Sequence, residues 1–206
     1  MAVLVCAGAA PRAKSILDEK LDQKTIKMLV EQGQLLNLIY DDKGELIHRM
    51  CVVLVNAKPD VVWDAITDFQ NYDKFVPGMQ PAVLRDKKKD EVTVDFTLKI
   101  NIIMGVSSTQ EYSTRYVFKK PILYMYNPKE PKKEPGFWKL VPIDNGARTI
   151  LYYYDTPPDL TKMGSLVAGV SKAKPEIALA LQVSPISILL NQTKSYIERK
   201  TKQAGQ

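Results

Sequence analysis

The sequence has 206 residues, 45% of them hydrophobic and 25% charged, with a formal net charge of +6 at pH 7. This composition is that of an ordinary globular protein and excludes a disordered, collagen-like or disulfide-rich chain. Two cysteines, Cys6 and Cys51, and one histidine, His48, are too few for an ordinary zinc site without carboxylates. We therefore expect neither a metal nor another cofactor.

The first ten residues form a short apolar run, and residues 7–9 (AGA) have the small-x-small form of a signal-peptidase site. No lysine or arginine precedes this run, so a cytosolic tail fits it equally, and both an exported and a cytoplasmic location stay open. The following pattern predicts a helix over residues 15–32, with Ser15 as its cap and Gly33 at its end. Residues 1–33 are interpreted as an N-terminal segment outside the main domain.

Two apolar stretches, residues 34–40 and 45–57, flank a spacer with the composition of a tight turn, so a β-hairpin is predicted. His48 lies in the second stretch, where it faces solvent or the hairpin neighbour. No Ser, Cys or Asp stands at a recognisable spacing from it, so it is given no catalytic role. Pro59 can open a helix, and apolar residues then recur at helical spacing until about Tyr72.

The middle of the chain has the clearest strand signal. Across residues 92–102, six apolar residues alternate with five polar ones in a strict period of two. Further strands are predicted at residues 112–118, 122–126, 137–141 and 149–155. Consecutive strands with short connections indicate an antiparallel sheet with one apolar face.

The C-terminal part returns to a helical composition. Apolar residues dominate residues 178–197, but Pro175 and Pro185 interrupt the run. We therefore expect a kinked helix, or a helix that follows a lead-in segment. Residues 201–206 are polar and are expected to fray. An antiparallel sheet with helices at both ends of the chain predicts the α+β class.

Residues 54–79, LVNAKPDVVWDAITDFQNYDKFVPGM, resemble the opening of the START-related, polyketide cyclase and coenzyme Q-binding superfamily, also called helix-grip proteins. Residues 136–154 resemble a strand pair of the same superfamily, and residues 185–200 its closing helix. The resemblance covers about residues 50–200. It implies a curved antiparallel sheet wrapped around a long C-terminal helix, and residues 34–200 are interpreted as one START-like domain. The N-terminal helix is an addition to that pattern.

The resemblance also implies a function, the binding or carriage of a hydrophobic small molecule or lipid in an internal apolar pocket. Such a pocket would lie between the sheet and the C-terminal helix. The predicted ligand-binding residues on the inward face are Phe96, Leu98, Ile100, Tyr112, Tyr116, Trp138, Leu140, Ile150, Tyr152 and Tyr154. The same side chains can instead fill a solid core, although a buried tyrosine needs a hydrogen-bond partner, which a pocket wall offers.

The alternative is a cyclase, aromatase or dehydratase on the same fold, which needs an acid or a base inside the pocket. Asp95, Glu111 and Arg115 fall on the polar face of their predicted strands and point away from it. No catalytic residue is therefore assigned, and a role without catalysis is favoured.

The expected partner is the hydrophobic molecule or lipid itself. Lysines at 87–89, 129, 132 and 133 lie in predicted loops, where they can support transient contact with an anionic membrane or simply keep the loops soluble. Basic residues are otherwise dispersed, so no nucleic acid partner is expected.

Overall fold

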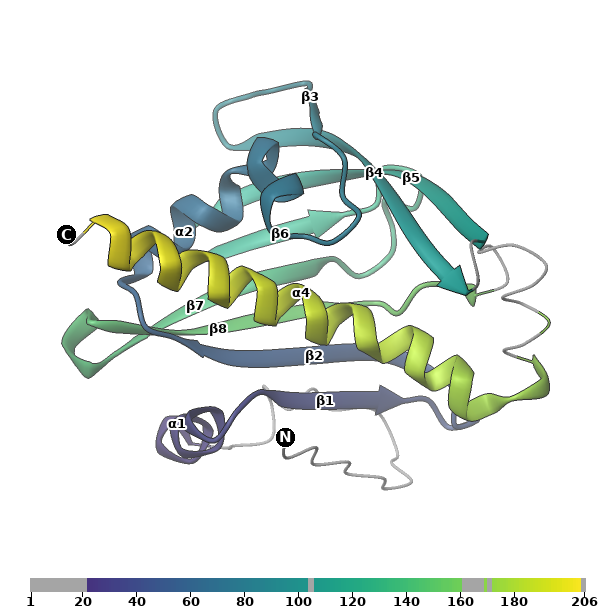
Figure 1. Cartoon of the computed structure of the whole chain (residues 1–206), viewed down its shortest axis with the longest axis horizontal. Coiled ribbons are helices and arrows are strands. Elements are labelled where there is room, and N and C mark those ends of the chain that lie inside the picture. Colours follow the sequence, from purple (N-terminus) through teal and green to yellow (C-terminus); the bar gives the residue numbers. More distant parts are fainter. Residues whose placement is uncertain (1–21, 104–105, 161–168, 170–171, 205–206) are drawn as a thin grey trace.

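The computed structural model describes residues 22–103, 106–160, 169 and 172–204 (Figure 1). Its centre is a sheet in which neighbouring strands are antiparallel, with the order β1-β2-β8-β7-β6-β5-β4-β3. The strands are β1 (Leu35–Tyr40), β2 (Leu46–Val55), β3 (Val83–Arg85), β4 (Glu91–Ile103), β5 (Val106–Lys119), β6 (Ile122–Tyr126), β7 (Gly136–Ile143) and β8 (Arg148–Asp155). The predicted hairpin and meander are confirmed, and β2 pairs with β8 to join the two.

Helices cover both faces of this sheet. The long helix α4 (Pro175–Ala204) lies across one face, which we call the inner face, together with α2 (Pro59–Thr67) (Figure 1). The short α1 (Gln23–Glu31) packs on the opposite, outer face. Two short 3₁₀ segments, η1 (Phe69–Lys74) and η2 (Asp144–Gly146), complete the described elements. A curved sheet around a long C-terminal helix, with an N-terminal helix added, confirms the predicted α+β helix-grip class.

Helix α1 begins later than the sequence pattern predicted. Asp22 is its N-cap, because the Asp22 carboxylate accepts a 2.7 Å hydrogen bond from the backbone N–H of Thr25. The predicted cap at Ser15 is therefore wrong for this helix, and residues 15–21 lie outside the described residues. Ile26 and Val30 anchor α1 to the outer face of the sheet.

The strands at the centre of the sheet are buried on both faces. Cys51 and Val53 of β2 belong to the inner core, whereas Met50 and Val52 belong to the outer core under α1. As a result β2 and β8 are buried almost without interruption, and their sequences show little of the alternation that marks β4.

Helix α4 is one continuous helix of 30 residues that starts at Pro175 and contains Pro185. The sequence left a kinked helix and a helix after a lead-in segment open, and here the helix passes through Pro185 and ends at Ala204. Ile186 and Leu190, in the middle of the helix, are buried against the sheet, but Ile177 near its start is exposed. Among the described parts of the chain, no helix is long and apolar enough to cross a membrane.

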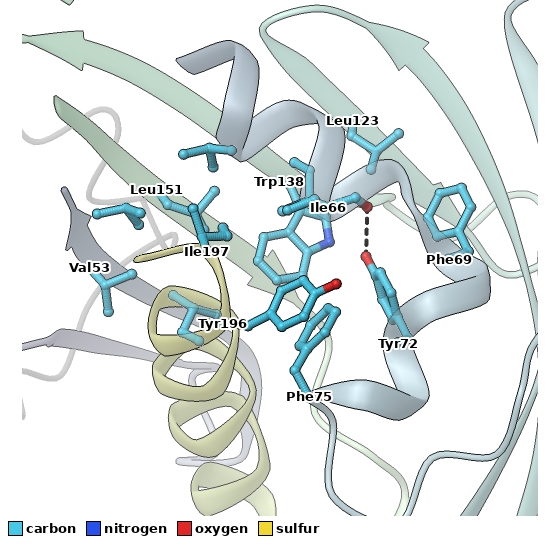
Figure 2. Packing of buried hydrophobic residues seen from close by; sticks show 14 of the residues in the cluster. Val53, Ile66, Phe69, Tyr72, Phe75, Leu123, Trp138, Leu151, Tyr196 and Ile197 are labelled. Carbon is cyan, nitrogen blue, oxygen red and sulfur yellow. Dashed lines mark hydrogen bonds between the residues drawn. The ribbon is translucent and has the colours of Figure 1, made fainter. Parts of the chain in front are cut away.

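The residues that suggested the superfamily have structural roles. The hydroxyl of Tyr72 donates a 2.7 Å hydrogen bond to the carbonyl oxygen of Ile66 at the end of α2 (Figure 2). The side-chain amide of Asn71 donates a 2.6 Å hydrogen bond to the Asp68 carboxylate. These bonds fix the turn from α2 into η1, which holds Phe75 against Tyr196 of α4 at a ring distance of 4.6 Å.

Candidate functional site

Four of the predicted site residues lie together on the inner face, where they are almost fully buried. Phe96, Tyr116, Trp138 and Leu140 all belong to the core beneath α4 and α2. Trp138 is 2% exposed and meets the ring of Tyr153 edge-on at 4.5 Å (Figure 2 shows its surroundings). Neither of the two pockets characterised among the described residues includes Trp138. Trp138 is instead packed among the side chains of the inner core.

Packing becomes looser toward the N-terminal half of α4. Tyr112, directly opposite Phe96 in the β4–β5 ladder, exposes 42% of its surface. Leu98, Tyr153 and Val183 are only half-buried against the same core. We call Leu98, Tyr112, Tyr153 and Val183 the open end of the inner face. The side chain of Ile100, the remaining predicted residue of β4, lies outside the described part of the structure.

A buried ion pair lies beside the open end. Arg49 of β2 stands directly opposite Asp155 of β8, and its Nε and Nη2 atoms donate to the two carboxylate oxygens at 2.6 and 2.8 Å. Arg49 also donates to the backbone carbonyl of Gln182 in α4. Tyr153 adds a 3.1 Å hydrogen bond from its hydroxyl to Asp155. The network therefore ties the sheet to α4 next to the open end.

The phenols of the inner face are held in their neutral form. Burial raises the pKa of Tyr116 and Tyr153 well above the usual range, and the negative charge of Asp155 adds to the effect at Tyr153. For Tyr112, whose side chain is only partly covered, desolvation also raises the pKa. At neutral pH these groups are protonated and cannot act as bases, and the single proton of Tyr153 is already donated to Asp155.

The predicted inward position of Ile150, Tyr152 and Tyr154 is wrong. All three point to the outer face and belong to the core under α1. The β7–β8 register pairs Trp138 with Tyr153, so the inward residues of β8 are Leu151 and Tyr153. A strand buried on both faces offers no alternation, and an error of one residue exchanges its two faces.

Sequence reasoning missed Arg49 and Asp155, and it left Tyr153 out of the predicted ligand-binding residues. Arg49 did carry a signal, because it is a charged residue inside the apolar run LIHRMCVVLV. A buried charge requires a partner of opposite sign, but the partner is 106 residues away in the chain. Only the strand register brings the two together.

Comparison with known proteins supports the same fold. A family described as polyketide cyclase / dehydrase and lipid transport matches residues 55–174, more than half of the chain. No curated protein matches the sequence. Among solved structures, the chain is similar to a STAR-related lipid transfer protein from Xanthomonas axonopodis, with a TM-score of 0.59, 14% identity, and coverage of 81% of this chain and 94% of that one.

Two further structures broaden the comparison. The Zhui aromatase/cyclase from a Streptomyces species gives a TM-score of 0.57 and 20% identity over 77% of this chain and 97% of that one. Human STARD10 gives a TM-score of 0.52 and 11% identity over 94% of this chain and 85% of that one. At these identities the likeness establishes the fold, which occurs in a STAR-related lipid transfer protein and in an aromatase/cyclase.

Proposed function

The chain belongs to the polyketide cyclase/dehydrase and lipid transport family, and on that premise we propose that it binds or carries a hydrophobic small molecule or lipid between the inner face of its sheet and α4. The ligand contacts the open end, where Leu98, Tyr112 and Val183 offer apolar surface that the core does not cover. Burial of such surface contributes roughly 25 cal/mol per Å², which is enough to hold a lipid-sized molecule without a charged contact.

The observation that carries this proposal is the contrast in burial along α4. From Ile186 onward the helix packs against the core through Ile186, Leu190 and Ile197, whereas nearer its start Val183 is only half-buried and Ile177 is exposed. A ligand that enters beneath the N-terminal half gains apolar contacts without displacing the sealed core. In this proposal, the space for the ligand comes from a movement of α4 away from the sheet and not from a pre-formed cavity.

The polar end of such a ligand meets hydrogen-bond donors rather than acid–base groups. A phenol is protonated at neutral pH, and burial raises the pKa of Tyr112 and Tyr153 further. The single proton of Tyr153 is donated to Asp155, whose oxygens also accept bonds from Arg49. A carboxyl, carbonyl or hydroxyl group on the ligand therefore fits beside Tyr112, and the chemistry there favours holding a ligand over converting it.

A cyclase, aromatase or dehydratase is the second candidate, and Asp155 is the observation that favours it. It is a largely buried carboxylate beside two tyrosines at the edge of the proposed ligand space. Activity would require Arg49 to release Asp155 when substrate binds, so that the carboxylate can accept a proton.

Contact with an anionic membrane remains a weaker part of the proposal. Lys88 and Lys133, in two of the lysine-rich loops, form ion pairs with Glu91 and Glu130. These pairs reduce the positive charge that the loops present to a lipid surface.

The test combines native mass spectrometry of the purified chain with titration of a fluorescent fatty acid. We expect saturable binding, and about fivefold weaker binding for Tyr112→Phe, which corresponds to the loss of one hydrogen bond of about 1 kcal/mol. Tyr152→Phe is the matched control, because it removes a tyrosine hydroxyl from the outer face instead. Equal affinity of the two variants, or no saturable binding, contradicts the proposed site. Recovery of a chemically altered ligand would instead support the cyclase, aromatase or dehydratase.

A further inference from the structure

A second pocket, separate from the inner-face site, lies where β2 begins and β8 ends. Its volume is about 470 Å³, within the range of small-molecule sites. Leu46, Ile47, Pro157 and Pro158 give it apolar walls, and His48 and Glu134 give it polar ones. None of the residues predicted to bind the hydrophobic ligand lines it, so it requires its own explanation.

Glu134 is the charged group that sets the chemistry of this pocket. Its carboxylate accepts a 3.4 Å hydrogen bond from the hydroxyl of Tyr154, and its other oxygen lies 3.3 Å from Nε2 of His48. Within the described part of the chain no lysine or arginine forms an ion pair with Glu134, and its side chain is 62% exposed. Lys133, the basic residue in the lining, is instead 3.4 Å from Glu130.

A stack of three rings holds these groups in position. The His48 and Tyr154 rings lie 5.1 Å apart and nearly parallel, and Tyr154 stacks on Phe137 at 5.0 Å. Burial and then the charge of Glu134 raise the pKa of Tyr154, so its phenol stays protonated and donates to the carboxylate. Glu134 is thus the partner of His48 that the sequence pattern did not show. It comes from the β6–β7 connection and is 86 residues away in the chain.

We propose that this pocket binds a small organic ammonium ion, with the ammonium group on the Glu134 carboxylate and the apolar body against Leu46, Ile47 and the two prolines. The remaining lone pairs of Glu134 accept N–H bonds from the cation, which is a charge-assisted interaction. The Glu134 carboxylate repels a carboxylate of similar shape.

His48 supplies the assay, because it is the single histidine of the chain. Its imidazole signals in the NMR spectrum of the full-length protein report on this pocket alone. Phenethylamine is the probe, with 2-phenylethanol and 3-phenylpropionate as neutral and anionic compounds of similar shape. We expect phenethylamine to shift the His48 signals with a Kd on the order of 1 mM. The alcohol should bind about fivefold more weakly and the acid not measurably.

Glu134→Gln tests the role of the charge while preserving the shape of the side chain. It should weaken phenethylamine binding about fivefold and remove the preference over the alcohol. Glu45→Gln is the matched control, because Glu45 directly precedes Leu46 but does not line the pocket, and it should change the affinity less than twofold. Equal binding of amine and alcohol, an unaffected Glu134→Gln variant, or unmoved His48 signals would overturn the proposal. Uptake of a fluorescent fatty acid by His48→Ala should match the wild type, which separates this site from the inner-face site.

Discussion

Replacing Trp138 with alanine tests whether this residue is part of the inner core. Trp138 is 2% exposed and contacts Tyr153 edge-on at 4.5 Å, so truncation removes a fully buried indole and one aromatic pair. Substitutions of this kind cost roughly 3–5 kcal/mol. With an unfolding entropy of about 2.1 cal/mol/K per residue and 206 residues, the melting temperature should fall by about 7–12 °C.

Thermal melts followed by circular dichroism measure this difference against Lys99→Ala. Lys99 is exposed on β4, and exposed polar changes usually stay within about 0.5 kcal/mol, or roughly 1 °C for a chain of this length. Shifts of equal size in the two variants would refute the assignment of Trp138 to the inner core.

Three further predictions concern stability and ionisation. Arg49→Ala leaves the Asp155 carboxylate without its buried partner and should cost roughly 3–5 kcal/mol in urea unfolding, part of which the double variant with Asp155→Ala should recover if the loss is electrostatic. Gly78→Ala should destabilise the chain more than Gly44→Ala. Both glycines have a positive φ, but a Cβ atom at position 78 collides with the backbone carbonyl of Lys99, whereas one at position 44 meets open space. Equal melting temperatures of the two variants would contradict this prediction. Absorbance titration at alkaline pH should leave some of the ten tyrosines un-ionised at pH 11 until denaturant is added. Because their folded pKa is raised, the stability they contribute is present below about pH 10 and is lost as the pH rises, since the unfolded chain releases their protons first; full ionisation of the native protein at pH 11 would contradict it. The tyrosines with raised pKa are Tyr72, Tyr112, Tyr116, Tyr152, Tyr153 and Tyr154.

Whether the sequence predicts which residues of a strand point inward depends on whether one face of that strand is exposed to solvent. Strand β4 has one wet and one buried face, so Val92, Val94 and Phe96 alternate visibly with polar residues and their inward position is confirmed. Strand β8 is covered by α4 on one side and α1 on the other, so Ile150, Tyr152 and Tyr154 could not be assigned to a face by pattern. Two-sided burial removes the periodic signal on which such predictions depend.

The polar part of the candidate site depended on information that local patterns do not contain. Arg49 and Asp155 meet only because β2 pairs with β8, the strand that closes the meander. Similarly, Glu134 reaches His48 from a loop between two other strands. Local patterns in a sequence predict elements, whereas these contacts follow from strand order and register.

The central claim is that the hydrophobic ligand lies at the open end, between the inner face of the sheet and the N-terminal half of α4. Photocrosslinking with a diazirine-bearing fatty acid, followed by peptide mapping, tests it most directly. We predict saturable labelling of peptides that contain Leu98, Tyr112 or Val183, suppressed by an excess of unmodified fatty acid. Saturable labelling confined to outer-face residues such as Tyr124 or Tyr152, or labelling that no competitor suppresses, would contradict the account.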